Sequence, residues 1–456
     1  MLSGKATLDT CVYPLSSLTI VPATRAQRLE SQLRIHEEWG NGATIDEHLE
    51  REASIYRVLT SFSPEPGAHI VWVLVPRDDP QTLDYLCSCE THRHAAITTA
   101  KPPGPSPIPR QSVDNHSSVE DIVAYAIETV FTPLRLRGKG YASHMMRLLH
   151  HVLAPPSSLS LASPFPTTEW GAPPVIPPGF GNARVSYLYS DVGPFYASCG
   201  PGVEKRGGWV VKGPKSTIWE VNRLSDALDQ VWGRRGGERD GERVGLKRWR
   251  RLDEKALRAI LDEDADRFRD DLMRWERQDV RAANVTPADG HLPSSTLPGS
   301  VHTKRRTRFA LLPNSGNVNF LIHRCLLGLP PRMRGRGIGL ESTWGARVDN
   351  SDAFISWVIE PNEAPDRILV TRLRCPSVEL LPTLLAAALE AANEYGMTHI
   401  EVWNLPGELC DIASVLGLGG IETERDAHLP AMKWYGDDVD GEEQIEWVMN
   451  EKYPWC

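Results

Sequence analysis

Residues 130–153, VFTPLRLRGKGYASHMMRLLHHVL, decide the fold of this chain. A strand-like run ends at Pro133, and a turn with three basic side chains and two glycines follows. Apolar residues then recur at the spacing of one helix face, at Met145, Met146, Leu148, Leu149 and Leu153. Glycine lets the backbone turn tightly, and a helix start offers unpaired N–H groups at its positive end. The stretch therefore predicts a strand–turn–helix unit that binds an anion, with a phosphate group as the usual ligand.

The turn itself reads R-x-x-G-x-A, from Arg137 through Gly140 to Ala142. Arg137 and Lys139 can add charge-assisted hydrogen bonds to a phosphate. The P-loop pattern G-x-x-x-x-G-K-[ST] is absent, and a dinucleotide fingerprint would need three glycines and a later acidic residue. From these residues alone, an ordinary helix start with solvated basic side chains stays open as the alternative.

Composition limits the classes of function. The chain has 456 residues, which predicts two or three domains. Its net charge is −9, from 50 basic and 59 acidic residues, so it is a poor general binder of nucleic acid. The eight cysteines are scattered without a CxxC pair, and Cys87 and Cys89 are expected to be packed thiols. No signal peptide and no membrane-spanning run is evident, so we expect a cytoplasmic location and no membrane partner.

The order of expected elements is that of an α/β chain. Strands are predicted at 69–75, 83–90, 123–132 and 183–190, with a short helix in DVGPFYASCG, residues 191–200. GGWVVKG and STIWEVN, residues 207–213 and 216–222, are expected to form a hairpin. Proline-rich stretches at 100–118 and 154–182 are expected to be loops. These patterns predict a domain at 1–230, a charged linker and helical connector at 231–306, and a second α/β domain at 307–456.

The strand, glycine turn, helix, strand and F-Y-containing short helix together resemble the GNAT superfamily of acyl-CoA N-acyltransferases. Further segments, including HEEWG, CSCET, LYSDVGPFYASCG and the terminal NEKYPWC, are similar to the fungal lysine N-acetyltransferase family of lysine catabolism. The resemblance covers nearly the whole chain apart from its proline-rich stretches. It implies a mixed sheet flanked by helices, followed by a second α/β domain. It also implies that acetyl-CoA is the acyl donor, that L-lysine is the small-molecule acceptor, and that no metal is needed.

The same resemblance assigns roles to individual residues. The strand edge at Val130, Phe131 and Thr132 would pair with the amides of the pantetheine arm. The pyrophosphate would be held by the turn residues, which are Arg137, Gly138, Lys139, Gly140, Tyr141 and Ala142. Tyr196, in the short helix, would protonate the departing thiolate.

The acceptor amine must lose a proton before it can attack, because a lysine side chain has a pKa near ~10.4. A general base is therefore expected. Glu128 on the strand is the nearest acidic candidate, although it could instead point away, and Glu52 and Asp191 are alternatives. Lysine recognition would also need an acidic group and a basic group, for which the N-terminal helices around Arg51 and Glu52, or the C-terminal tail, are the candidate sources.

A second R-x-x-G-x-G pattern occurs in RMRGRGIG, residues 332–339. No helical pattern follows it, so we expect a loop and no second coenzyme site. The second domain is then expected to be a degenerate acyltransferase-like unit that shapes the first domain's cleft. Two other functions remain open: an acetyltransferase for another amine or a protein lysine, and an acyl-CoA-binding pseudoenzyme. Oligomeric state cannot be inferred from the sequence.

Overall fold

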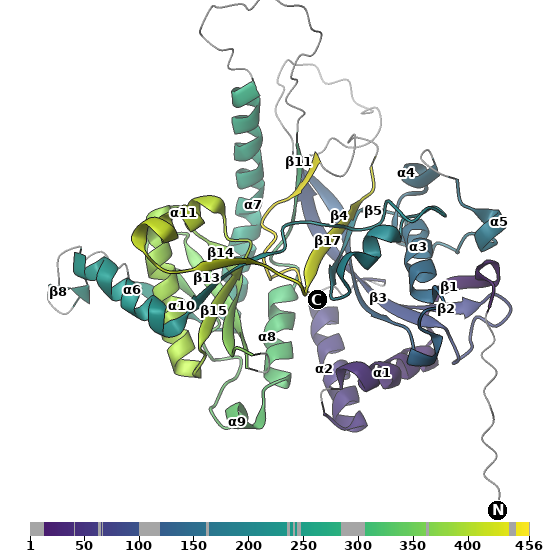
Figure 1. Cartoon of the computed structure of the whole chain (residues 1–456), viewed down its shortest axis with the longest axis horizontal. Coiled ribbons are helices and arrows are strands. Elements are labelled where there is room, and N and C mark those ends of the chain that lie inside the picture. Colours follow the sequence, from purple (N-terminus) through teal and green to yellow (C-terminus); the bar gives the residue numbers. More distant parts are fainter. Residues whose placement is uncertain are drawn as a thin grey trace, which may run out of the picture.

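The computed structural model describes residues 13–455 apart from a set of gaps, which are 41, 63–64, 66, 100–118, 161–163, 235–237, 240–241, 244–247, 284–305, 362–363 and 437–443. The described residues form two large mixed sheets, each flanked by helices (Figure 1). The fold class predicted from the sequence is therefore confirmed. The proline-rich stretch at 100–118 lies outside the described residues.

The first sheet contains nine of the described strands, and most of its neighbours are antiparallel. Its strands are β1 (Leu18–Pro22), β2 (His69–Pro76), β3 (Cys87–Thr98), β4 (Glu120–Phe131), β5 (Ala183–Ser190), β17 (Leu429–Trp434), β6 (Val210–Val211), β11 (Thr307–Leu311) and β18 (Ile445–Trp447). β4 and β5 are parallel neighbours. The chain crosses between them through α3 (Tyr141–Leu153), whose apolar side is fully buried. The strands predicted at 69–75, 123–132 and 183–190 are confirmed, whereas the strand predicted at 83–90 begins only at Cys87 and continues to Thr98.

Two helices at the N-terminus, α1 (Arg25–Trp39) and α2 (Ile45–Phe62), pack against each other beside this sheet. Thr44 caps α2: its hydroxyl accepts from the Glu47 N–H at 3.3 Å, and the Glu47 carboxylate accepts from the Thr44 N–H at 2.8 Å. Such reciprocal bonds satisfy two helix-end donors. The shorter helical segments of this half are η1 (Leu15–Ser17), η2 (Leu134–Leu136), α4 (Pro156–Ser160), α5 (Thr167–Trp170) and η3 (Gly193–Ser198).

The second sheet is built mainly from the later half of the chain. Its strands, in spatial order, are β10 (Trp249–Leu252), β12 (Gly345–Val348), β13 (Phe354–Glu360), β14 (Arg367–Arg374), β15 (His399–Trp403), β7 (Lys215–Glu220) and β16 (Ile421–Glu424). Its helices are α6 (Val221–Arg234), α7 (Glu254–Ala283), α8 (Asn317–Leu327), α9 (Pro331–Arg334), η4 (Val378–Leu380), α10 (Leu381–Tyr395) and α11 (Gly407–Leu416). A short hairpin, β8 (Glu238–Arg239) with β9 (Glu242–Arg243), stands apart.

The two sheets exchange strands. The expected hairpin at 207–222 is wrong, because β6 pairs with β17 in the first sheet while β7 pairs with β15 and β16 in the second. In return, β11, β17 and β18 from the later half join the first sheet. The chain therefore passes several times between the sheets, and the last described residues run between them (Figure 1).

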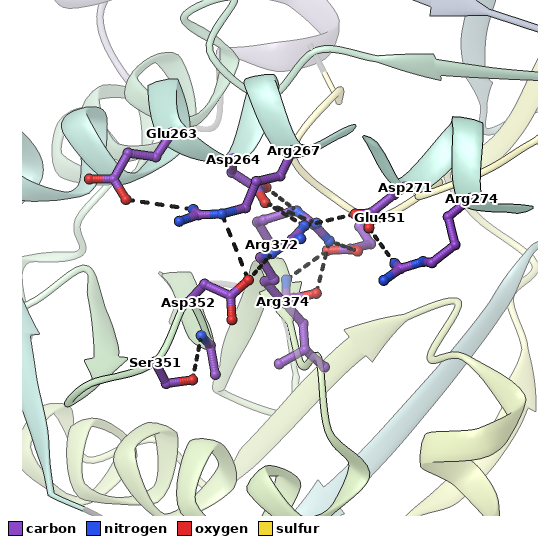
Figure 2. A network of polar contacts seen from close by, with 12 residues as sticks. Glu263, Asp264, Arg267, Asp271, Arg274, Ser351, Asp352, Arg372, Arg374 and Glu451 are labelled. Carbon is purple, nitrogen blue, oxygen red and sulfur yellow. Dashed lines mark hydrogen bonds and ion pairs between the residues drawn. The ribbon is translucent and has the colours of Figure 1, made fainter. Parts of the chain in front are cut away.

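Buried ion pairs fasten that last segment in place (Figure 2). Arg372 on β14 is almost inaccessible and donates from Nε to Asp264 of α7 at 2.7 Å. The Nη1 atom of Arg372 pairs with one carboxylate oxygen of Glu451. The other oxygen of Glu451 accepts from the Leu373 N–H at 2.7 Å. Arg374 joins the network through Asp264 at 3.1 Å. Because a buried charge is tolerated only beside its partners, this network locks α7, β14 and the C-terminal segment together.

No helix among the described residues has the length and apolar character that crossing a membrane requires.

We expect Arg372→Met to destabilise the folded chain strongly, since it leaves Glu451 buried without its cation and leaves Asp264 with Arg374 alone. Breaking a buried pair from one side costs about 3–5 kcal/mol, and chemical denaturation followed by tryptophan fluorescence would measure the loss. Arg250→Met, at an exposed position on β10 outside the network, is the control and should change stability by less than about 0.5 kcal/mol. Equal stability of the two variants would contradict the structural role of the network.

Candidate functional site

The glycine turn has the features of an anion site. Gly138 and Gly140 have φ of 77° and 84°, a conformation that favours glycine. A Cβ built on either glycine would meet nothing within 4 Å, so the space in front of the turn is open. Gly140 is the N-cap of α3 and no side chain caps its first N–H groups. Lys139 Nζ is shielded from solvent and has no partner among the described residues, which leaves a positive charge available to a ligand.

The other predicted turn residues have structural contacts. Arg137 donates to the Thr132 carbonyl at 3.0 Å and to Glu38 at 2.9 Å, so it braces the turn against α1. Tyr141 is buried, and its hydroxyl accepts from the Tyr13 N–H at 3.2 Å. Ala142 packs partly buried against the core around α3. The open donors are therefore Lys139 and the backbone, and the charge of Arg137 is already paired.

The strand that leads into the turn has a free edge. β4 pairs with β5 only as far as Ile127 opposite Leu188. The next four residues of β4, including Val130 and Phe131, have no partner on β5, and Thr129 adopts a φ of 52° that accompanies an irregularity in the pairing with β3. The two strands thus separate where the chain approaches the turn. An extended ligand with amide groups can add to such an edge.

Thr132 ends this segment, and its side chain already has a contact within the protein. Its hydroxyl donates to Cys87 Sγ at 3.3 Å, and burial raises the pKa of the Cys87 thiol to about 12. Cys89 is equally buried, and its pKa also lies well above the usual value. The prediction that both are packed thiols is confirmed.

Glu128 lies at the point where β4 and β5 separate and forms an ion pair with buried His92 of β3. Beside it, His69 of β2 pairs with Glu90 at 2.6 Å, and the two imidazole rings stack at 4.1 Å between centroids. Burial raises the pKa of Glu128, but the charge and hydrogen bond of His92, together with the charges of His69 and Arg324, lower it to about 2. Burial lowers the pKa of His92, but the charge and hydrogen bond of Glu128, together with the charge of Glu90, raise it. The resting pair is therefore an imidazolium facing a carboxylate.

The same four residues could also hold a divalent cation. His69, Glu90, His92 and Glu128 each offer one ligand atom, and these atoms all lie within 4.8 Å of one another. Imidazole and carboxylate donors in this number suit zinc. A metal would have to displace the two His–Glu pairs, so the paired state and the metal-bound state exclude each other.

Tyr196 lies on η3 and packs edge-on against Phe195 at 5.1 Å and Trp209 at 6.4 Å between ring centroids. Burial, followed by the neighbouring thiols Cys87 and Cys89, raises the pKa of its phenol above the usual range. The phenol is therefore protonated at neutral pH and can act as an acid. The nearby Cys199 donates weakly to Ser143 at 3.5 Å, consistent with the structural role expected for it.

The two alternative acidic residues occupy different positions. Asp191 accepts from the His428 N–H at 2.7 Å and pairs with its ring at 3.0 Å, so it anchors the start of β17. Glu52 on α2 lies 3.5 Å from Arg51. Burial and the charge of Glu90 raise its pKa, although Arg51 and Arg324 act in the opposite direction. Glu52 therefore belongs to the same charged region as Glu90 and Glu128.

Sequence reasoning missed the histidines. His92 and His94 are two apart in β3 and both are buried. Ionisable residues that alternate in an otherwise buried strand are a signal that sequence inspection can find. His94 has no partner for either ring nitrogen among the described residues, and burial lowers its pKa to about 3.

The second glycine pattern has none of the features of the first. Residues 331–334 form the single short turn α9 and no helix follows Gly337. Arg332 pairs with Asp366 at 2.7 Å and Arg336 donates to the Tyr395 carbonyl at 3.0 Å. These arginines are occupied by protein contacts. The loop expected at 332–339 is confirmed for residues 335–339 and is wrong for residues 332–334, which belong to α9.

Parts of this chain are similar in sequence to known proteins. Residues 238–456 match the family model described as LYC1 GNAT-like C-terminal domain. A lysine acetyltransferase of Yarrowia lipolytica is 26% identical over 192 residues, which are 41% of this chain and 39% of that relative. The match therefore spans less than half of the relative's length.

Solved structures of GCN5-related N-acetyltransferases also align with the chain. The one from Kribbella flavida covers 91% of this chain and 70% of its own, at 12% identity and a TM-score of 0.43. The one from Anabaena variabilis covers 92% and 73%, at 6% identity and a TM-score of 0.44. The match at residues 238–456 is the more specific finding, and over these residues the chain is similar to LYC1 GNAT-like C-terminal domains.

Proposed function

We propose that this chain transfers the acetyl group of acetyl-CoA to the side-chain amine of free L-lysine. The observation that carries the proposal is the single run from Glu128 to Gly140, which joins a half-buried carboxylate, a free strand edge and an open anion site. A thioester with a diphosphate tail and an amine that must be deprotonated need these three features in this order. The name of the Yarrowia relative supports lysine as the acceptor.

In this proposal the coenzyme lies along the separated strands. The backbone of Val130, Phe131 and Thr132 binds the pantetheine amides, and the pyrophosphate sits on the N–H groups that open α3. Lys139 adds a charge that has no hydrogen-bond partner in the described part of the chain. Arg137 acts indirectly, because its bonds to Thr132 and Glu38 hold the turn in shape.

Removal of the amine proton is assigned to the Glu128–His92 pair. Glu128 alone is a weak base, since its pKa is about 2 and the amine holds its proton with a pKa near ~10.4. Once His92 has lost its own proton, it can accept another proton from the amine. The raised pKa of His92 describes how strongly it holds that proton. We therefore assign proton acceptance to His92, with Glu128 raising its basicity and orienting it.

The final step is departure of the coenzyme thiolate. Tyr196 is protonated because burial raises its pKa, and in this proposal it donates that proton as the amide forms. The product is N6-acetyl-lysine and free coenzyme A, with no covalent intermediate on the protein. The proposed physiological setting is lysine catabolism in the cytoplasm, as the resemblance to the fungal enzymes suggests.

Purified protein should release thiol from acetyl-CoA in a saturable way with L-lysine, and the product should carry the acetyl group on the side-chain nitrogen. The panel includes ornithine, polyamines and a histone-tail peptide, with mass spectrometry to place the acetyl group. Turnover of another amine only would replace the substrate. Coenzyme binding without turnover of any amine would point instead to an acyl-CoA-binding module.

Tyr196→Phe keeps the ring packed against Trp209 but removes the proton that the thiolate needs. General acid catalysis contributes about 10²–10⁴-fold, so we expect kcat to fall by a factor in this range with coenzyme affinity unchanged. Cys199→Ser, a change beside the same helix, is the matched control and should retain activity. An unchanged kcat in Tyr196→Phe would remove Tyr196 from the mechanism.

The pH profile tests the Glu128–His92 pair. Activity needs the pair without its proton, so kcat/KM for lysine should rise through an apparent pKa above the usual histidine value of about 6.5. Glu128→Gln removes the attraction and leaves burial, so the inflection should move below that value while kcat falls. His92→Asn should abolish the inflection. If both variants retain the wild-type inflection, the proton acceptor lies elsewhere.

A further inference from the structure

Arg324 links the two halves of the molecule. It lies on α8, which packs directly against α2 of the first half (Figure 1). We use the word seam for the region where α2, β3 and β4 face α8, β13 and residues 451–455. The Pro454 carbonyl is held from both sides of this seam, by Tyr187 of β5 and by Asn317 of α8, each at 3.2 Å. The position of Arg324 is therefore set by contacts from both sheets.

The carboxylates around Arg324 already have their own partners. Electrostatic interactions connect Arg324 with Glu128, Glu52 and Glu360. Glu128 pairs with His92, Glu52 lies beside Arg51, and Glu360 accepts from Arg367 at 3.0 Å. Their negative charge makes the seam attractive to cations, and none of these carboxylates forms an ion pair with Arg324.

The side chain of Arg324 is exposed to solvent, and its guanidinium makes no hydrogen bond or ion pair with any residue in the described part of the chain. Its contact is a stacking one, with Cζ 4.4 Å from the centre of the Trp455 ring. Lys452 Nζ lies 3.9 Å from the centre of the same ring. A stacked guanidinium keeps its planar fork of donors free for a carboxylate.

We propose that the seam is a binding site for an amino acid with a basic side chain, in which Arg324 binds the α-carboxylate and Glu128, Glu90 and Glu52 attract the side-chain ammonium. The proposal rests on the proposed acetyltransferase function and deepens it. A free amino acid carries both charges, whereas a lysine within a protein lacks the free carboxylate. Arg324 would therefore select free lysine over protein lysine, and it is contributed by the half of the chain that lacks the glycine turn.

The test compares L-lysine with L-lysinamide, which keeps both amines and replaces the carboxylate with a neutral amide. Wild-type protein should prefer lysine in kcat/KM. Arg324→Gln should lower kcat/KM for lysine about 10- to 100-fold, chiefly through KM, as expected for loss of a charged hydrogen-bonded pair, and should leave lysinamide nearly unchanged. Arg250→Gln removes an exposed charge on β10 and should behave as wild type with both substrates.

Arg324→Lys keeps the positive charge without the fork and should give a smaller loss that is again specific to lysine. Coenzyme affinity and thermal unfolding show whether Arg324→Gln folds. If it does not fold, Arg324→Lys replaces it in the comparison of lysine with lysinamide. Equal losses with lysine and lysinamide would mean that Arg324 acts only by tuning Glu128, and unchanged kinetics would mean that it has no role; either result overturns the proposal. Failure of the wild-type protein to acetylate any amine would instead overturn the proposed function.

Discussion

A charge that leaves water needs an opposite charge beside it, and this constraint governs how the two sheets of this chain meet. Asp264, Arg372 and Glu451 satisfy it entirely within the protein. Their network ties the C-terminal segment to β14, and the Tyr453 hydroxyl then donates to the Leu311 carbonyl at 2.7 Å, in a strand of the other sheet. Residues 451–455 are consequently fixed between the sheets, and Lys452 and Trp455 reach the seam. This attachment adds to the pairing of β11 with β3 and of β17 with β5, which also joins the later half of the chain to the first sheet.

Burial acts on the proposed catalytic groups in two directions. At Tyr196 no opposite charge compensates it, so the phenol pKa rises and the acid stays protonated. At Glu128 and His92 the mutual attraction exceeds the burial effect, so the carboxyl pKa falls and the imidazole pKa rises. Environments that move the pKa values of titratable groups apart in this way indicate which group acts as the acid and which as the base. Glu128 lies where β4 separates from β5, next to the strand edge proposed for the coenzyme.

The sequence predicted the local units well and the long-range ones poorly. The strand, glycine turn and helix at 123–153 are fixed by neighbours in sequence, and they appear as expected. The wrong hairpin at 207–222 shows the limit, because β6 and β7 find partners about 200 residues away. Glu128 stood out because it lies on the strand next to the turn. His92 and Arg324 come from other elements, and their meeting at one point depends on packing that no local pattern encodes.

The division between the halves gives the second half a role. The glycine turn, Glu128 and Tyr196 all precede residue 238, where the match to the LYC1 GNAT-like C-terminal domain begins. Arg324, Lys452 and Trp455 all fall within that match. The proposed donor chemistry and the proposed acceptor recognition thus lie in different halves and meet at the seam. In this proposal, a second α/β unit without an anion-binding turn of its own is useful for a physical reason, because it supplies an unpaired cation beside the carboxylates of the first half.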